Sequence, residues 1–254
     1  MPSSQKHTTV QSEDGTFTAF SKEFGEHYHS TKDGALTESL QKHVIPAFEL
    51  SKNKSELTIL DICFGLGFNT LATLYYMKRE GIQKKLSVYS PEFDRELINS
   101  LQYFQYPDIF DDLKKIIVSL STTGEYKDDD LHVSLYLGDA REYLLICKEK
   151  FDIVYQDAFS PAANPLLWTK EYFKDIKKLI KDDGVLTTYS VSLATRLALH
   201  QNGFNIYLAT PKGCRSSTIA SPSPIEGYEV VDMPHKILCN PGAKALSDAD
   251  IQSL

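Results

Sequence analysis

Short apolar runs alternate with amphipathic stretches over most of the chain, and this alternation predicts the fold. Six runs rich in β-branched or aromatic residues predict strands at Leu57 to Asp61, Lys85 to Ser90, Leu131 to Leu137, Phe151 to Gln156, Val185 to Tyr189 and Phe204 to Ala209. Between them, apolar residues recur at helical spacing and predict helices over Asn69 to Arg79, Arg95 to Phe104, Arg141 to Lys148, Trp168 to Ile180 and Ser192 to Gln201. Such alternation is typical of an α/β protein whose mostly parallel sheet carries helices on both faces.

The two ends of the chain depart from this pattern. Ser217 to Ala220 predicts a further strand, antiparallel to the sixth and joined to it by the turn at 211–213, which makes the expected sheet seven-stranded. Before the sheet, an aromatic segment over Phe17 to His29 precedes an amphipathic helix over Gly34 to Phe48. We therefore expect an N-terminal extension at 1–50, an α/β domain at 51–240 and a loosely ordered tail at 241–254.

Composition narrows the class of protein. The 254 residues carry a net charge of −7 with a pI near 5.5, which weighs against a broad basic surface that coats nucleic acid. A local basic patch remains open, because lysines recur at 170, 174, 177, 178 and 181, and Lys212 and Arg215 lie in a glycine loop. The alternative interpretation of these residues is a solvated helix face and an ordinary turn.

Cysteine and histidine usage argues against metal or disulfide chemistry. The four cysteines are widely spaced without a C-x-x-C pair, which fits a reducing cytoplasm. His27 and His29 have no acidic or cysteine partner at metal-ligand spacing, so no metal is expected. The N-terminus lacks the apolar core of a signal peptide, and no apolar run is long enough to span a bilayer, so we expect a soluble protein.

The segment 61–70, Asp-Ile-Cys-Phe-Gly-Leu-Gly-Phe-Asn-Thr, follows the first strand and opens a helix. Glycines at 65 and 67 let the backbone approach a ligand closely, and the following helix presents unpaired N–H groups. The stretch does not match the dinucleotide fingerprint G-x-G-x-x-G. Instead it resembles the first motif of S-adenosylmethionine (SAM) methyltransferases, although Cys63 stands where the first glycine of that motif would be. A tight turn without a ligand is the alternative interpretation.

Acidic residues follow the next two strands. Glu92, with Asp94 as the fallback, is placed to accept the ribose hydroxyls of a nucleoside. Asp139 is placed to accept a hydrogen bond from an adenine amino group, or to cap the helix that begins at Arg141, and both roles are compatible. The glycine motif, Glu92 and Asp139 follow the first three strands in the order expected of a SAM site, and together they favour one.

A fourth strand ends in the run 157–168, Asp-Ala-Phe-Ser-Pro-Ala-Ala-Asn-Pro-Leu-Leu-Trp. This run, the glycine motif and Gly138 to Arg141 resemble the methyltransferase domain of the MnmC family, and the likeness extends from about Phe20 to about Ser221. The resemblance implies a Rossmann-like class I SAM-dependent methyltransferase fold. It also implies methylation of the aminomethyl group of 5-aminomethyl-(2-thio)uridine at the tRNA wobble position. Many members are fused to an FAD-dependent oxidase that makes this amine, so a separate protein would supply it here.

The resemblance and the strand-end positions together give the expected site. The N-terminal extension would cap it. Asp157 is the expected catalytic residue, which orients the amine or helps take its proton. The expected cofactor-binding residues are Tyr28, Glu38, Asp61, Phe64, Gly65, Gly67, Asn69, Glu92, Asp139 and Ala140. The expected substrate-binding residues are Phe159, Pro161, Asn164, Trp168, Lys212 and Arg215, with Trp168 equally able to act as a core anchor.

Two other functions remain open at this stage. An aminopropyltransferase of the spermidine-synthase type, or a methyltransferase of other small amines, would use the same fold and suits the acidic pI. A catalytically silent SAM-fold protein that binds a protein or RNA partner would account for Cys63 in the glycine motif. The choice of cofactor distinguishes an aminopropyltransferase from the tRNA methyltransferase. Failure to bind SAM would favour the silent binding protein.

Overall fold

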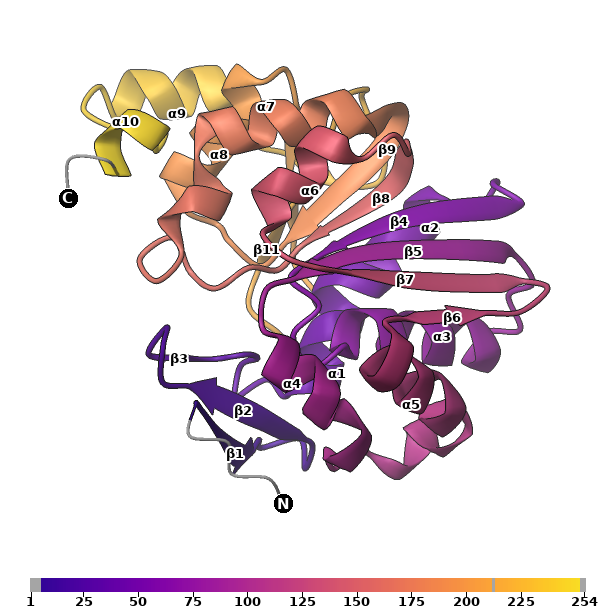
Figure 1. The fold of residues 1–254 in the computed structure, drawn as a ribbon. Coiled ribbons are helices and arrows are strands. Elements are labelled where there is room, and N and C mark those ends of the chain that lie inside the picture. Colours follow the sequence, from indigo (N-terminus) through magenta and orange to yellow (C-terminus); the bar gives the residue numbers. More distant parts are fainter. Residues whose placement is uncertain (1–5, 212, 252–254) are drawn as a thin grey trace.

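A computed structural model describes residues 6–211 and 213–251, whose central feature is a twisted sheet of nine strands (Figure 1). In spatial order the strands are β12 (Glu229–Val230), β10 (Asn205–Ala209), β11 (Ser217–Ser221), β9 (Ile180–Thr188), β8 (Phe151–Gln156), β4 (Glu56–Ile62), β5 (Lys85–Glu92), β7 (Leu131–Leu137) and β6 (Glu125–Lys127). The pairs among β9, β8, β4, β5 and β7 are parallel, whereas β11, inserted between β9 and β10, is antiparallel to both. The predicted α/β class is confirmed.

The predicted strand count was too low. The two additional strands, β6 and β12, are short antiparallel edge strands of three and two residues. Segments this short carry no alternating apolar pattern and form only because a neighbouring edge offers hydrogen-bonding groups. The other seven strands correspond to the seven that the sequence predicts.

Helices cover both faces of the sheet, and the alternation of side chains along β4 shows why. Leu57 and Ile59 belong to the core under α3 (Phe68–Arg79), α4 (Arg95–Ser100) and α5 (Lys114–Thr123). Leu60 and Ile62 belong to the core under α6 (Ala140–Ile146), α7 (Lys170–Leu179) and α8 (Leu193–Gln201). Burial on both faces explains the nearly continuous apolar runs.

Several helix boundaries differ from the prediction. α4 ends at Ser100 and continues as a 3-10 turn, η2 (Leu101–Tyr103), and another, η3 (Asp108–Leu113), precedes the unpredicted α5. Trp168 ends a further 3-10 turn, η4 (Pro165–Trp168), and α7 begins after Thr169, whose hydroxyl accepts a hydrogen bond from the Tyr172 N–H at 3.1 Å. A side-chain cap therefore sets the start of α7 two residues later than the apolar spacing indicates.

The N-terminal extension is itself structured. β1 (His7–Gln11), β2 (Phe17–Ser21) and β3 (Glu26–His27) form a separate antiparallel sheet that Figure 1 shows beside the carboxyl ends of the central strands. The predicted helix at 34–48 consists of α1 (Ala35–Glu38), a π-helical turn η1 (Ser39–Val44) and α2 (Ile45–Leu50). Pro46, which lacks an N–H, is the second residue of α2, just after the π-helical turn in which regular i→i−4 bonding is interrupted.

The tail is packed rather than loose, contrary to expectation. α9 (Met233–Cys239) precedes it, and its described part, 241–251, contains α10 (Asp248–Ile251). The Arg141 guanidinium donates to both carboxylate oxygens of Asp248 at 2.8 and 2.6 Å, and the Lys170 N–H donates to the Leu246 carbonyl at 2.8 Å. No helix within the described ranges is both long and apolar enough to cross a membrane.

Candidate functional site

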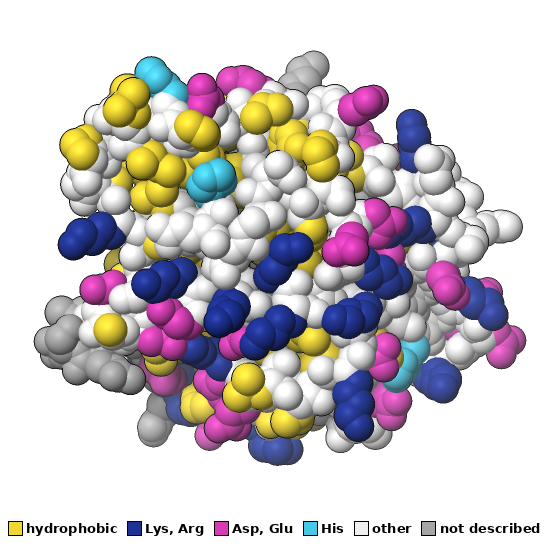
Figure 2. All heavy atoms as spheres, turned by 90° about the horizontal axis from the view of Figure 1, so that it is seen from above, with side chains coloured by type: hydrophobic (Ala, Val, Ile, Leu, Met, Phe, Trp, Pro, Cys, Tyr) yellow, Lys and Arg dark blue, Asp and Glu magenta, His cyan; other side chains and the backbone are white. Residues whose placement is uncertain are grey.

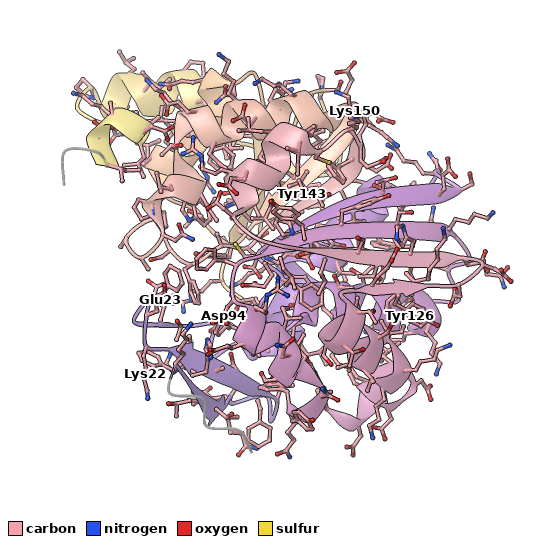
Figure 3. All side chains as sticks on the ribbon, in the orientation of Figure 1. Lys22, Glu23, Asp94, Tyr126, Tyr143 and Lys150 are labelled. Atoms are coloured by element: carbon pink, nitrogen blue, oxygen red, sulfur yellow. The ribbon has the colours of Figure 1, made fainter. Side chains whose placement is uncertain are left out.

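A cavity of about 830 Å³ opens at the carboxyl ends of β4, β5, β7 and β8, where the chain leaves the sheet in opposite directions. The N-terminal sheet forms its outer wall. Figure 3 labels Glu23, which follows β2, and Asp94, which follows β5, and both line the cavity where that sheet meets the rest of the chain. The site is thus built from segments far apart in the sequence.

The cavity is rich in carboxylates. Among the described residues its lining includes seven acidic side chains, Glu23, Glu26, Glu38, Glu92, Asp94, Asp139 and Asp157, against three basic ones, Lys32, Lys42 and Arg215. An excess of negative charge in a partly enclosed space favours cationic ligands. A sulfonium or an ammonium group fits this lining better than an anion does.

The glycine turn keeps its geometry although Cys63 replaces a glycine. Cys63 has φ of 64°, and Gly65 and Gly67 have φ of 56° and 75°, so all three adopt the left-handed conformation. A Cβ at Gly65 would lie 3.0 Å from the Tyr28 ring, which packs against the turn. Burial raises the pKa of the Cys63 thiol well above its ordinary value, so the thiol stays protonated and is not a nucleophile.

The expected nucleoside-binding acids lie on this cavity wall. Glu92 is buried and accepts hydrogen bonds from the Gly65 and Asp94 N–H groups, both at 2.8 Å. Asp94 caps α4 by accepting from the Leu97 N–H at 3.0 Å. Asp139 caps α6 through Oδ1 alone, which accepts from two backbone N–H groups. Capping therefore leaves Oδ2 of Asp139 available to a ligand.

Asp157, at the end of β8, is held from two sides. Asn69 Nδ2, in the first turn of α3, donates to Oδ2 at 2.8 Å, and His43 Nε2 lies 3.4 Å from Oδ1. His43 is fully buried on the π-helical turn, and its Nδ1 lies 3.0 Å from the Thr187 hydroxyl. Burial acts to raise the pKa of Asp157, but His43, followed by His29 and Asn69, outweighs it and lowers that pKa. Asp157 therefore faces the cavity as a carboxylate.

Beside Asp157, the cavity wall carries a buried ion pair from the N-terminal extension. Lys42 Nζ donates to Glu38 at 2.7 Å and to Asp33 at 3.2 Å. Glu38 also accepts from the Ser30 N–H at 2.7 Å. Burial acts to lower the pKa of Lys42, but Glu38 and Asp33 outweigh it and raise that pKa, so Lys42 keeps its positive charge. These bonds fix the extension against the site.

Asp61 lies behind the glycine turn rather than on the cavity wall. It is fully buried and accepts a hydrogen bond from the Thr70 hydroxyl at 2.7 Å. Burial, with a contribution from the nearby Asp157 charge, raises the pKa of Asp61 to about 7. Two carboxyl groups linked through Asn69 thus have opposite pKa shifts, and only Asp157 is charged in mildly acidic solution.

Replacing Asp61 by asparagine should flatten the dependence of stability on pH. The unfolded chain ionises this carboxyl near pH 4, whereas the folded chain keeps its proton to about pH 7, so wild-type stability falls as pH rises through that window. Asp61→Asn removes this loss, and urea unfolding should show a pH 5 to pH 7 difference smaller by on the order of 2 kcal/mol. Asp129→Asn, in an exposed loop, is the control, and an unchanged pH dependence in Asp61→Asn would contradict the assignment.

The 157–168 loop covers the cavity from the side of α7. Trp168 is 1% exposed and its Nε1 donates to the Phe159 carbonyl at 2.7 Å, so it anchors the loop from beneath. The Phe159 ring stacks on Phe24 of the N-terminal segment, with ring centroids 4.6 Å apart. The Ser160 N–H donates to Glu26 at 2.9 Å. The loop and the N-terminal sheet are therefore joined directly over the site.

Most of the residues expected from the sequence line this cavity. They are Tyr28, Glu38, Phe64, Gly65, Asn69, Glu92, Asp139, Ala140, Asp157, Phe159, Asn164 and Arg215. Asp61, Gly67, Pro161 and Trp168 do not line it, because Asp61 and Trp168 are buried beneath the turn and the loop that they support and Gly67 caps α3. Lys212 lies outside the described residues.

Sequence reasoning missed His43, Lys42 and the role of Glu26. His43 and Lys42 lie on an amphipathic helix where a histidine or lysine at this spacing is usually solvated. The partner of His43, Asp157, is distant in the sequence, whereas Lys42 pairs with the nearby Glu38 and Asp33. The one available signal was that the apolar face of this helix is interrupted by polar residues. The described residues contain no cluster of three or more potential metal ligands.

Comparison with known proteins agrees with this geometry. A family model described as S-adenosyl-L-methionine-dependent methyltransferase matches residues 107–223. The crystal structure of MnmC2 from Aquifex aeolicus is 30% identical, superimposes with a TM-score of 0.84, and the match covers 98% of this chain and 81% of that one. This chain belongs to the MnmC methyltransferase-domain family. The resemblance stated from the sequence motifs is confirmed, as is the SAM methyltransferase fold.

Two curated relatives extend the match. An uncharacterized protein of Methanocaldococcus jannaschii is 34% identical over 203 residues, which is 80% of this chain and 55% of that protein. The tRNA 5-methylaminomethyl-2-thiouridine biosynthesis bifunctional protein MnmC of Leptospira interrogans is 27% identical over 217 residues, 74% of this chain and 31% of that protein. The chain thus spans about half or less of the length of these relatives.

The cavity fits SAM, the cofactor of the MnmC methyltransferase family. Gly65 lines the cavity without a side chain of its own, and Glu92 and Asp139 stand at the ends of two adjacent strands. Carboxylates at these positions suit ribose hydroxyls and an adenine amino group. The acidic lining suits the positive sulfonium.

Proposed function

We propose that this protein transfers a methyl group from SAM to the aminomethyl group of 5-aminomethyl-(2-thio)uridine at the wobble position of tRNA. The observation that carries the proposal is the ionised Asp157, held at the cavity by Asn69 and His43. The role of the MnmC relative in tRNA 5-methylaminomethyl-2-thiouridine biosynthesis and the likeness to MnmC2 support the same substrate. The carboxylate-rich lining favours an amine over an anionic acceptor.

When bound, SAM supplies an electrophilic methyl group and a neutral thioether leaving group. The reacting amine must be neutral, and its positive charge develops as the new N–C bond forms. Asp157 accepts a hydrogen bond from the amine N–H, aims the nitrogen lone pair and stabilises the developing ammonium. A carboxylate with a lowered pKa is a weak proton acceptor, so we assign Asp157 to orientation and charge stabilisation, with the proton passing to solvent.

His43 is a positioning residue in this scheme. His43→Leu removes one of the two groups that hold the carboxylate, so the pKa of Asp157 should rise. The acidic limb of the kcat/KM pH profile should then move to higher pH, while His43→Gln, which retains a side-chain donor, should move it less. A lower rate with an unchanged pH profile in His43→Leu would indicate a structural role only.

The wider organisation follows from the same proposal. The N-terminal extension, residues 1–50, caps the cofactor site of the domain at 51–240, and residues 241–254 form a tail. Phe159 and Asn164 contact the uridine, with Arg215 near the mouth of the cavity. A tRNA substrate implies a cytoplasmic enzyme, and a separate protein generates the aminomethyl group.

The decisive experiment is methyl transfer from labelled SAM to tRNA that carries unmethylated aminomethyl groups at wobble uridines, followed by nucleoside mass analysis. A gain of one methyl on that nucleoside is the expected result. SAM binding is measured separately by calorimetry, so that failure of binding, which favours a silent binding protein, is distinguished from failure of transfer.

An aminopropyltransferase is the second candidate, because the acid-rich cavity also suits a polyamine. Decarboxylated SAM with putrescine tests it directly. Product in this assay, together with no methyl transfer to tRNA, would replace the proposed function with the polyamine one.

A further inference from the structure

A second cavity, of about 230 Å³, adjoins the SAM cavity. It is lined by Val191, Leu193, Arg196, Val231, Lys236 and Asn240. Val191, which follows β9 at the carboxyl edge of the sheet, lines both cavities. The two cavities therefore adjoin at Val191.

Arg196, on α8, is fixed in place but has no counter-charge. Its Nε donates to the Thr218 hydroxyl at 3.0 Å, and that hydroxyl donates to the Ser190 carbonyl at 2.7 Å. Its Nη2 is buried without a hydrogen-bond partner among the described residues. Burial lowers the pKa of Arg196, with no carboxylate near enough to oppose the shift.

The rest of this cavity offers donors and no acid. Lys236 and Asn240 lie on and just after α9, and no aspartate or glutamate belongs to the described lining. Elsewhere on the same side of the molecule, basic side chains are interspersed with acidic ones, as Figure 2 shows. Lys178 of α7, for example, pairs with Asp175 at 2.7 Å. An arginine held half-buried without such a partner carries an electrostatic cost that a bound anion would offset.

We propose that Arg196 and Lys236 bind a backbone phosphate of the RNA whose modified nucleotide enters the SAM cavity. The inference rests on the proposed function and names the part of the substrate that this protein holds beside the reacting base. The Arg196 guanidinium supplies a charge-assisted hydrogen bond to a phosphate oxygen, and Lys236 adds charge at the rim. Phosphate contacts of this kind fix the register of the RNA without reading its sequence.

The test measures the affinity of the full chain for tRNA over a series of salt concentrations, with SAM affinity measured in parallel. Arg196→Gln and Lys236→Gln should each weaken tRNA binding about tenfold and lower the slope of log K against log salt by about one. Lys178→Gln removes the same charge from a paired surface lysine and should change neither quantity. SAM affinity should be unchanged in all three variants, which also shows that each is folded.

Inorganic phosphate at constant ionic strength identifies the source of the anion. Phosphate should compete with tRNA for the wild-type protein, and less so for Arg196→Gln. Unchanged tRNA affinity and salt slope in both variants would overturn the inference, even if phosphate alone stabilises the protein. A wild-type protein that binds SAM but no tRNA would overturn the proposed substrate as well, and the two failures are thereby distinguished. Lys236 is exposed, so its variant decides the matter if Arg196→Gln fails to fold.

Discussion

Asp157→Asn is expected to lower kcat by about a hundredfold to a thousandfold while leaving SAM affinity within about twofold. Asparagine keeps the size of the side chain but removes the charge that stabilises the developing ammonium. It also places an amide NH2 against Asn69, which donates to the carboxylate, or against His43, which lies beside it. Single-turnover methyl transfer and calorimetric titration of SAM measure the two effects separately.

The control for this variant is Asp129→Asn, which removes the same charge in an exposed loop and should leave kcat unchanged. An equal loss of SAM affinity and turnover in Asp157→Asn would assign Asp157 to the cofactor instead. A rate close to that of the wild type would remove it from the chemistry.

Trp168→Ala is expected to destabilise the fold by about 3 to 5 kcal/mol, the largest stability effect that we anticipate. The indole is buried between the 157–168 loop and α7, and it contacts the rings of Phe173 and Tyr189 as well as the Phe159 carbonyl. Removal of the indole leaves a large cavity under the 157–168 loop. Urea unfolding of the full chain measures the change.

Trp168→Phe separates packing from hydrogen bonding. Phenylalanine fills much of the space but leaves the Phe159 carbonyl without its donor, at a cost of about 1 to 3 kcal/mol. Its KM for tRNA should rise, because Phe159 is then less well fixed. If Trp168→Ala unfolds at the same urea concentration as the wild type, the indole does not anchor the loop. That result would favour the other expectation, that Trp168 contacts the substrate.

The sequence predicted those features that depend on local pattern. Apolar runs located the seven main strands, and the order of polar groups at strand ends brought Glu92, Asp139 and Asp157 to one cavity. Cys63 lowered the apparent specificity of the glycine motif, yet it adopts the left-handed conformation that a glycine would. At Cys63 the backbone conformation of the glycine motif is kept although the glycine is replaced.

Features that depend on distant contacts could not be predicted. His43 reaches Asp157 from a helix more than a hundred residues earlier, and nothing in the spacing of that helix distinguishes it from a solvated histidine. The burial of Trp168 and Asp61 beneath the wall, rather than on it, also depends on packing that a linear pattern does not contain. The unpaired Arg196 is recognisable only once its surroundings show no acid.

The contact between Glu26 and Ser160 has a consequence for how the protein is made. These residues are 134 positions apart, so the N-terminal sheet leaves the ribosome well before the loop to which it binds. At about 5 to 20 residues per second, that interval lasts roughly 7 to 27 s. Throughout it, Phe24 has no Phe159 to stack against, and the aromatic side of the nascent hairpin is open to other chains. The wall of the cavity is therefore completed late in synthesis, even though β1, β2 and β3, the first strands to emerge, pair with one another.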